Sequence, residues 1–268
     1  MLLKVNHVTR YAYDQPVRAA VQSHRLTPSV FDGQKVLSWT VSVSDGQKGG
    51  GFRDGAGDWV QSWSVLGPVS EILVHVEGEV ETRDLAGVLR GHKELISPEC
   101  YLVDTMLTEV DQALIALTDG LRDETDALAR AHELSRRVSE AISYVSGVTD
   151  TDTTAAEALA KGEGVCQDQS HALLAIARHL DMPARYVSGY LQATLGGESH
   201  DAAHAWAEIW IAGLGWVGFD PANRCCPDEK YIRLGSGLDS RDAAPIRGIS
   251  RGMGRETLDV SVRVQVQQ

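Results

Sequence analysis

The stretch Gly162-Glu163-Gly164-Val165-Cys166-Gln167-Asp168 joins a glycine-containing loop to an apolar helical pattern that continues to about Leu180. This pattern places Cys166 in the first turn of the helix, where free backbone N–H groups and the helix dipole favour a negative charge. The thiolate is the nucleophilic form of cysteine, and a helix N-terminus lowers a thiol pKa from its usual value of about 8.5. Cys166 is therefore a candidate nucleophile, although a free cysteine is more often a small buried apolar residue.

A strand pattern downstream supplies an imidazole. Residues 203–211 alternate, so that His204, Trp206 and Glu208 share one face and small or aliphatic side chains share the other. We expect the aliphatic face to pack on a helix. The face with His204 is expected to line a wet cleft, with Glu208 on its polar rim. The alternative is an exposed strand face that carries a lone histidine.

A carboxylate follows at Asp220, where a second strand pattern ends before Pro221. If a hairpin pairs Ile211 with Gly215, His204 and Asp220 become diagonal neighbours on one face, within side-chain reach. A slip of one residue would place them on opposite faces. The alternative role for Asp220 is that of an ordinary turn residue. Thiol, imidazole and carboxylate, in this order, are the parts of a thiol-dependent acyl-transfer enzyme.

Residues 1–95 show sequence patterns that are typical of β-strands. Strand patterns cover 36–43, 59–66 and 72–80, and the glycine-rich stretch 46–57 predicts a long turn. Short strands separated by turn signals predict an antiparallel β-sandwich-like N-terminal domain.

Residues 96–268 mix helices with strands and are predicted to form a second domain, which makes the fold class α+β. The C-terminal stretch 258–266 alternates and could join either sheet. Thr154 and Glu157 have the spacing of a capping box. The predicted helices lie at 111–121, 126–144, 153–160 and 166–180, and the predicted strands at 184–191, 203–211 and 216–220.

Composition excludes several classes of protein. The 268 residues are 43% hydrophobic and 23% charged, and no run of 18 apolar residues predicts a membrane span. The net charge of −12 comes without a basic patch, so nucleic acid is not an expected partner. The N-terminus lacks the pattern of a signal peptide, and the cysteines Cys100, Cys166, Cys225 and Cys226 are expected to be thiols, which favours the cytoplasm.

Several segments together resemble the transglutaminase-like superfamily in its bacterial form. The start of the chain is similar to the β-rich region that often precedes this core. The matching segments are 11–28, Thr153 to Leu159, Gly162 to His171, Pro183 to Tyr190, His204-Ala205-Trp206 and Phe219-Asp220-Pro221.

The resemblance implies a papain-like, transglutaminase-like core of helices packed on an antiparallel sheet. It assigns Cys166 as the nucleophile, His204 as the base and Asp220 as the residue that orients the base. It also implies an oxyanion hole made of the N–H of Cys166 and one side-chain donor, for which Tyr144, Gln167 and Trp206 are candidates.

We therefore expect a cysteine hydrolase that acts on amide or isopeptide bonds of a peptide or protein. Transfer to an amine, as in a protein-glutamine gamma-glutamyltransferase, and an inert binding or scaffold module of the same fold are the alternatives. Neither a metal nor an organic cofactor is expected. His200 and His204 lack the glutamate of the zinc-peptidase motif, and Gly162-x-Gly164 lacks the lysine of a phosphate loop. The oligomeric state and the role of Cys225-Cys226 stay open.

Overall fold

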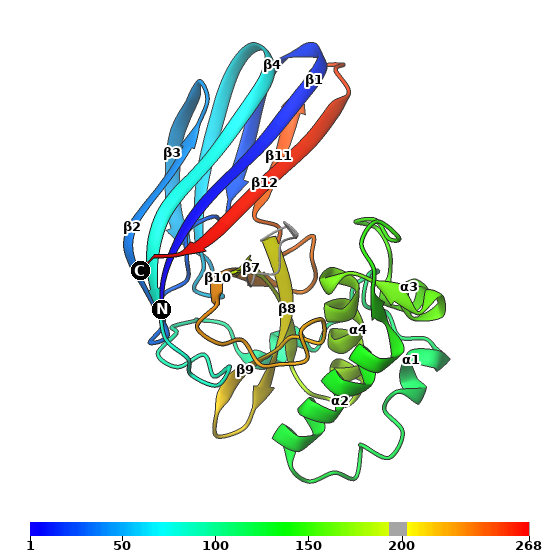
Figure 1. Cartoon of the computed structure of the whole chain (residues 1–268). Coiled ribbons are helices and arrows are strands. Elements are labelled where there is room, and N and C mark those ends of the chain that lie inside the picture. The colour runs from blue at the N-terminus through cyan, green and yellow to red at the C-terminus, as the bar shows by residue number, and fades with distance from the viewer. Residues whose placement is uncertain (193–202, 268) are drawn as a thin grey trace.

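The computed structural model of the chain describes residues 1–192 and 203–267. Within these ranges, a strand-rich N-terminal sheet stands beside a smaller sheet that is covered by helices (Figure 1). The elements are β1 (Leu2–His24), β2 (Gln34–Val43), β3 (Gly46–Arg53), β4 (Trp59–Thr82), η1 (Pro98–Tyr101), α1 (Gln112–Ala116), α2 (Ala127–Ala141), β5 (Ser143–Tyr144), α3 (Ala155–Lys161), β6 (Glu163–Gly164), α4 (Cys166–His179), β7 (Ala184–Leu191), β8 (Ala203–Ile211), β9 (Gly215–Phe219), β10 (Tyr231–Gly237), β11 (Ile246–Arg251) and β12 (Glu256–Val266).

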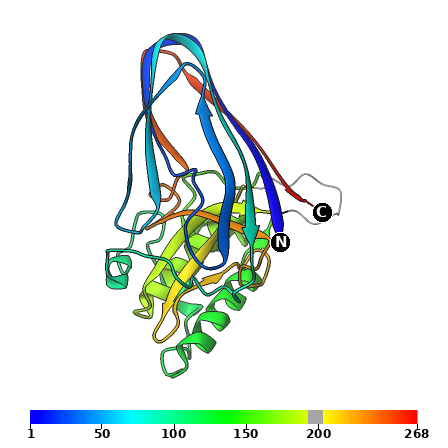
Figure 2. The ribbon, with the colours of Figure 1, turned by 90° about the vertical axis from the view of Figure 1, so that its left-hand side faces the viewer.

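The long strands β1 and β4 form the centre of the N-terminal sheet. They pair antiparallel, with a register irregularity between Ala12 and Ala19. β12 and β2 flank one half of this pair, and β11 and β3 flank the other. Figure 2 shows the strands bending over together at the end far from the helices, so that the two halves face one another. Buried side chains such as Val5, Val17 and Val65 fill the space between them, and the predicted antiparallel β-sandwich-like region is confirmed.

The C-terminal segment returns to this N-terminal sheet. β12 pairs with Leu3 to Tyr13 of β1, and β11 pairs with Ala19 to His24. The choice between the two sheets, which the sequence pattern left open, is thereby decided. The division of the chain at residue 95 stays a prediction.

The prediction of a long turn at 46–57 is wrong for most of its length. Residues 46–53 form β3, which pairs with β4. Glycines are used here because β4 comes close to this strand: a Cβ on Gly51 would lie 2.5 Å from the Trp59 ring, and one on Gly49 would lie 2.4 Å from Ser62 Oγ. The sequence pattern also divided β4 into two strands, and it did not predict β10 or β11.

The second sheet has the strand order β10-β7-β8-β9, with antiparallel pairing throughout. α4 lies against β8 and β7, and α2 and α3 pack on α4 (Figure 1). Leu173, Ile176 and Ala177 of α4 are fully buried, as predicted. On the side of β7 and β10, Tyr190 and Ile232 belong to the core of the N-terminal sheet. The second sheet is therefore buried between the helices and the N-terminal sheet.

The helix boundaries follow the capping residues. Asp126 accepts hydrogen bonds from the first amides of α2, and Thr154 and Glu157 form the predicted capping box of α3. α2 ends at Ala141, short of the predicted Tyr144, because Ile142 is extended and the next two residues pair with β6 as β5. α1 covers only Gln112–Ala116 of the predicted 111–121.

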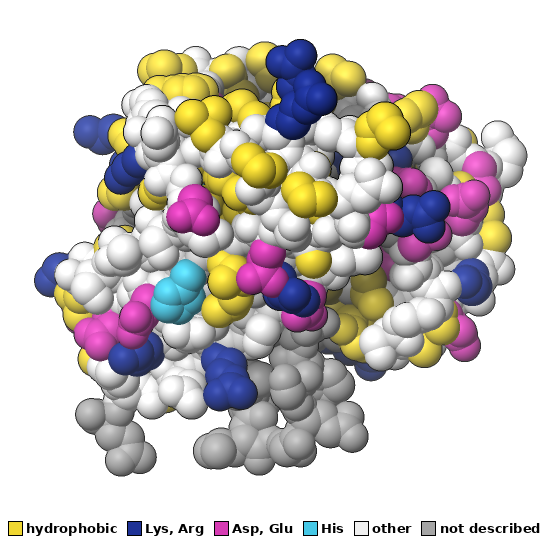
Figure 3. All heavy atoms as spheres, turned by 90° about the horizontal axis from the view of Figure 1, so that it is seen from above, with side chains coloured by type: hydrophobic (Ala, Val, Ile, Leu, Met, Phe, Trp, Pro, Cys, Tyr) yellow, Lys and Arg dark blue, Asp and Glu magenta, His cyan; other side chains and the backbone are white. Residues whose placement is uncertain are grey.

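Seen from the end of the N-terminal sheet, the surface carries many hydrophobic side chains (Figure 3). Val21 of β1 and Ile249 of β11 are directly paired and are 51% and 77% exposed. Leu66 of β4, opposite Ala19, is 67% exposed. The outer face of this sheet is thus partly apolar.

Candidate active site

Cys166 is the first residue of α4, and two glycines lead the chain to it. Gly162 ends α3 in the left-handed region, with φ of 69°. A Cβ on Gly164 would lie 2.8 Å from Asp168 Oδ2, so glycine leaves room for that carboxylate. The same oxygen accepts hydrogen bonds from the Val165 N–H and from Thr149 Oγ1, both at 2.7 Å. Asp168 thereby fixes the peptide just before Cys166. The N–H of Cys166 itself, at the start of the helix, has no partner within the helix.

β8 and β9 adopt the predicted register. Ile211 pairs with Gly215, and Ala207 pairs with Phe219. As expected for diagonal neighbours on one face, His204 Nε2 lies 2.6 Å from Asp220 Oδ2. The predicted proximity of imidazole and carboxylate is confirmed.

His204 also contacts Cys166, and its environment favours the charged imidazolium. Burial alone would lower the pKa of His204, but the hydrogen bond to Asp220, followed by the contact with Cys166, raises it to about 10. Since Nε2 is bound to Asp220, Nδ1 is the ring nitrogen that remains for the sulfur. One imidazole thus links the thiol to the carboxylate.

Asp220 is fully buried and is held by more donors than the sequence analysis identified. Its Oδ2 accepts hydrogen bonds from Asn223 Nδ2 at 2.7 Å and from the Tyr231 hydroxyl at 2.8 Å, in addition to His204. Burial would raise the pKa of Asp220, but these hydrogen bonds, with that of His204 first, lower it. Asn223 follows Asp220 in a turn at a spacing that suits an Asx-type contact, so a local signal existed. Tyr231 gave no such signal.

The three candidate oxyanion donors have different surroundings. Tyr144 lies in β5 opposite Gly164 and is 48% exposed. Gln167 is half-buried in the first turn of α4. Trp206 is buried and stacks on His204, with ring centroids 6.4 Å apart.

The prediction that Glu208 forms a wet, polar rim is wrong. Glu208 is 3% exposed, and its carboxylate contacts Arg185 Nε at 2.7 Å and Arg233 Nε at 2.9 Å. Burial alone would raise the pKa of Glu208, but Arg233 and then Arg185 lower it to about 2. The sequence pattern correctly gave the face of the strand. It could not show that Arg185, Arg233 and connecting segments such as 85–89 cover this face.

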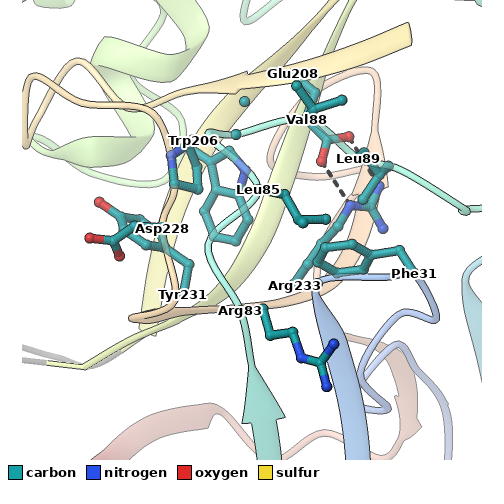
Figure 4. A pocket seen from close by; sticks show the side chains of 14 residues that line it. Phe31, Arg83, Leu85, Val88, Leu89, Trp206, Glu208, Asp228, Tyr231 and Arg233 are labelled. Carbon is teal, nitrogen blue, oxygen red and sulfur yellow. Dashed lines mark hydrogen bonds and ion pairs between the residues drawn. The ribbon is translucent and has the colours of Figure 1, made fainter. Parts of the chain in front are cut away.

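A cavity of about 40 Å³ lies behind the imidazole. Figure 4 shows Glu208 and Arg233 on one side of this cavity, facing each other, and Trp206 and Tyr231 on the other. Both rings contact His204, whereas Cys166 is not among the lining residues. The volume suits a few water molecules, and the charged groups on the Arg233 side are already paired.

Within residues 1–192 and 203–267, no group of three or more His, Cys, Asp or Glu side chains is placed to hold a metal ion. His200, one of the two histidines considered for zinc, lies outside the described residues. The four cysteines are unpaired. In the same part of the chain, none of the helices has the length and apolar character needed to cross a membrane.

The fold and the site define a protein with a helix-borne cysteine facing a histidine and a carboxylate on an antiparallel sheet. Residues 115–221 match the model of the transglutaminase-like superfamily, and residues 3–81 match that of the bacterial transglutaminase-like N-terminal region. The chain thus contains a transglutaminase-like core preceded by a bacterial transglutaminase-like N-terminal region. The first match contains Cys166, His204 and Asp220.

Several mycobacterial relatives match nearly the whole chain. An uncharacterized protein of Mycobacterium leprae is 29% identical over 280 residues, which cover 98% of each chain. An uncharacterized protein of Mycobacterium tuberculosis is 28% identical over 287 residues, which cover 97% of this chain and 91% of the relative.

Two further similarities are more limited: one covers only part of the chain, and the other concerns the fold. A protein-glutamine gamma-glutamyltransferase of Pseudomonas aeruginosa is 33% identical over 86 residues, which are 28% of this chain and 12% of that protein. The solved structure of a candidate cysteine protease from Cytophaga hutchinsonii has a TM-score of 0.74 at 20% identity, and the match covers 100% of this chain and 92% of that one. The latter likeness shows the common fold.

Proposed function

We propose that the chain is a cysteine hydrolase that cleaves amide or isopeptide bonds of a peptide or protein substrate. Cys166 is the nucleophile, His204 the general base and Asp220 the residue that orients the base. The observation that carries the proposal is the position of His204, which contacts Cys166 and binds the buried Asp220 at 2.6 Å. This linked arrangement is the recurring form of activated thiol nucleophiles.

The reaction proceeds in two halves. The Cys166 thiolate attacks the amide carbonyl carbon, and the carbonyl electron pair moves to oxygen. When this intermediate collapses, the C–N bond breaks and the His204 imidazolium gives its proton to the leaving amine, which leaves a thioester on Cys166. Neutral His204 then removes a proton from water, which attacks the thioester. The carboxylic acid leaves, and the thiolate–imidazolium pair is restored.

The negative oxygen needs hydrogen-bond donors. The first-turn amides of α4 point from a helix N-terminus and are suited to this task. Tyr144, Gln167 and Trp206 remain the candidates for the side-chain donor. Removal of one such donor typically lowers the rate about 10²–10³-fold.

Reactive-thiol labelling tests the nucleophile. Cys166 contacts His204, which can accept the thiol proton, whereas burial raises the pKa of Cys225 and raises that of Cys226 to about 11. We expect iodoacetamide at pH 6 to label Cys166 before the other three thiols, as measured by peptide mass spectrometry. Earlier labelling of Cys100, Cys225 or Cys226, with Cys166 silent, would contradict the assignment.

Transfer to an amine is the second candidate function. It is favoured by the 86-residue similarity to a protein-glutamine gamma-glutamyltransferase. We place hydrolysis first because Cys166 is partly exposed, and water reaches an exposed thioester at a far higher concentration than any amine.

Competition between the two acceptors separates these functions. A labelled peptide pool is incubated with a labelled primary amine, and bond loss, amine incorporation and ammonia release are followed together. We expect hydrolysis to dominate and Cys166→Ala to abolish it. Dominant amine incorporation that depends on Cys166 would favour the transferase, and a reactive thiol without any turnover would favour an inert module.

A further inference from the structure

Tyr231, the first residue of β10, reaches the carboxylate that holds the imidazole. We infer that Tyr231 is a positioning residue, which fixes Asp220 and, through it, His204. This inference rests on the proposed function of these two residues. It concerns a residue that lies outside the segment matched by the superfamily model, which ends at residue 221.

The hydrogen-bond geometry gives Tyr231 a direct hold on the carboxylate. Its hydroxyl donates to Asp220 Oδ2 at 2.8 Å, and the same oxygen lies 2.6 Å from His204 Nε2. Rotation of the carboxylate about its Cβ–Cγ bond would therefore break both bonds together. Burial, followed by the charge of Asp220, raises the pKa of Tyr231, so the hydroxyl keeps its proton and remains a donor.

The ring of Tyr231 also supports the imidazole. It lies 5.9 Å from the His204 ring at a 58° tilt and meets Trp206 edge-on at 5.5 Å. Trp206 in turn stacks on His204. Figure 4 shows the Tyr231 and Trp206 rings side by side at the cavity wall. The two aromatic rings thus limit the tilt of the imidazole while the hydroxyl holds its partner carboxylate.

The Tyr231 hydroxyl also contacts a second side chain, that of Cys225. Cys225 Sγ lies 3.3 Å from the Tyr231 oxygen, and the backbones of Cys225 and Asp220 exchange hydrogen bonds at 2.9 and 3.2 Å. The loop from Asp220 to Tyr231 is therefore held by these backbone hydrogen bonds at its start and by the Tyr231 hydroxyl on the carboxylate at its end. β9 and β10 lie at opposite edges of the sheet, so this tie spans the strand that carries His204.

A double-mutant cycle on Cys166 alkylation tests the role without a known substrate. Iodoacetamide labelling rates of Cys166 are compared in the wild type, Tyr231→Phe, Asp220→Ala and the double variant. Tyr231→Phe keeps the ring and removes only the hydroxyl. We expect it to slow labelling on the order of tenfold, which is typical of a lost hydrogen bond to a charged group. In the Asp220→Ala background the same substitution should have no further effect, because its target is absent.

Tyr190→Phe is the matched control. Tyr190 is also buried, and its hydroxyl lies 2.7 Å from His7 Nδ1, away from the carboxylate. The Tyr190→Phe variant should lose about as much thermal stability as Tyr231→Phe, but its Cys166 labelling rate should be unchanged. An equal effect of Tyr231→Phe with and without Asp220 would overturn the inference, as would an unchanged rate in the single variant. If Asp220→Ala itself has no effect, or if wild-type Cys166 reacts no faster than Cys100, the proposed function fails instead.

Discussion

At the residue scale, buried histidines of this chain have opposite charge states. His204 has a carboxylate partner, and its pKa is raised to about 10. Among the described residues, His7, His24 and His171 have no carboxylate at hydrogen-bond distance, and burial lowers the pKa of each to about 4. Burial disfavours a charge unless a partner offsets the lost hydration. The partner, rather than the depth of burial, therefore decides which histidine is charged at neutral pH.

This difference predicts how stability depends on pH. For the three neutral histidines the folded pKa lies below the unfolded value, so the unfolded chain binds more protons between pH 6.5 and about 4. Their contribution to the free energy of unfolding is present above pH 6.5 and is lost as the pH falls through 4. His204 behaves oppositely: its contribution is present below pH 6.5 and is lost as the pH rises through about 10.

Urea unfolding at several pH values measures the effect. We expect His24→Gln to reduce the acid-side slope of the unfolding free energy by at most about 1.4 kcal/mol per pH unit, the value for one proton. Thr118→Val, at another buried site whose side chain does not titrate, is the control and should leave the slope unchanged. Equal slopes in the wild type and His24→Gln would contradict the assignment of His24 as buried and neutral.

At the element scale, the start of α4 depends on a close fit between a glycine and a carboxylate. Asp168 Oδ2 binds the Val165 N–H and the Thr149 hydroxyl, and it occupies the space beside Gly164. The helix has no side-chain cap at its own N-cap residue, Val165. Asp168 therefore fixes the peptide that precedes the nucleophile.

Gly164→Ala should disturb this arrangement. The new Cβ would lie 2.8 Å from Asp168 Oδ2 and 2.9 Å from its Cβ, so the carboxylate must move. We expect a loss of about 1–3 kcal/mol, which is typical of overpacking, and slower labelling of Cys166. Thermal unfolding and the iodoacetamide rate are the two measurements. Gly50→Ala, where nothing lies within 4 Å of the added atom, is the control. Similar results for both variants would show that this fit is unimportant.

At the scale of the whole molecule, a buried ionic cluster joins the second sheet to the loop that precedes β4. Arg233 of β10 contacts Asp58, which precedes β4, at 2.7 Å and Glu208 of β8 at 2.9 Å. Arg185 of β7 completes the cluster and lies over the Trp216 ring at 4.1 Å. The side chains of Asp58 and Arg185 are fully buried. The position of the strand that carries His204 thus depends on residues of the N-terminal region.

Arg233→Met should therefore destabilise the whole molecule. It leaves Asp58 buried without its main cation, and the loss of one partner of a buried pair costs about 3–5 kcal/mol. Lys4→Met removes an exposed pair with Glu77, whose side chains are 40% and 53% exposed, and should cost less than about 1 kcal/mol. Denaturant unfolding compares the two. A loss in Arg233→Met no greater than that in Lys4→Met would contradict the structural importance of the cluster.

The sequence by itself determined the features that depend on short separations along the chain. The capping box of α3, the left-handed Gly162 and the helix that begins at Cys166 follow from residues within one or two turns. The β8–β9 hairpin has a short connection, so its register, and with it the approach of His204 to Asp220, could be deduced from the alternation of side chains. Fold class and candidate site were predictable for this reason.

Only the tertiary structure decided the contacts that no regular strand or helix pattern links, whether the partners are near or distant in sequence. Tyr231 meets Asp220 through a loop that crosses the sheet, and Arg233 meets Asp58 from 175 residues away. Glu208 was correctly assigned to its face, but a strand pattern cannot show which distant segment covers that face. The glycines of β3 look like a turn until the Trp59 ring beside them is known. Local patterns fix the direction in which a side chain points, whereas the packing of distant elements decides whether it meets water, a charge or another ring.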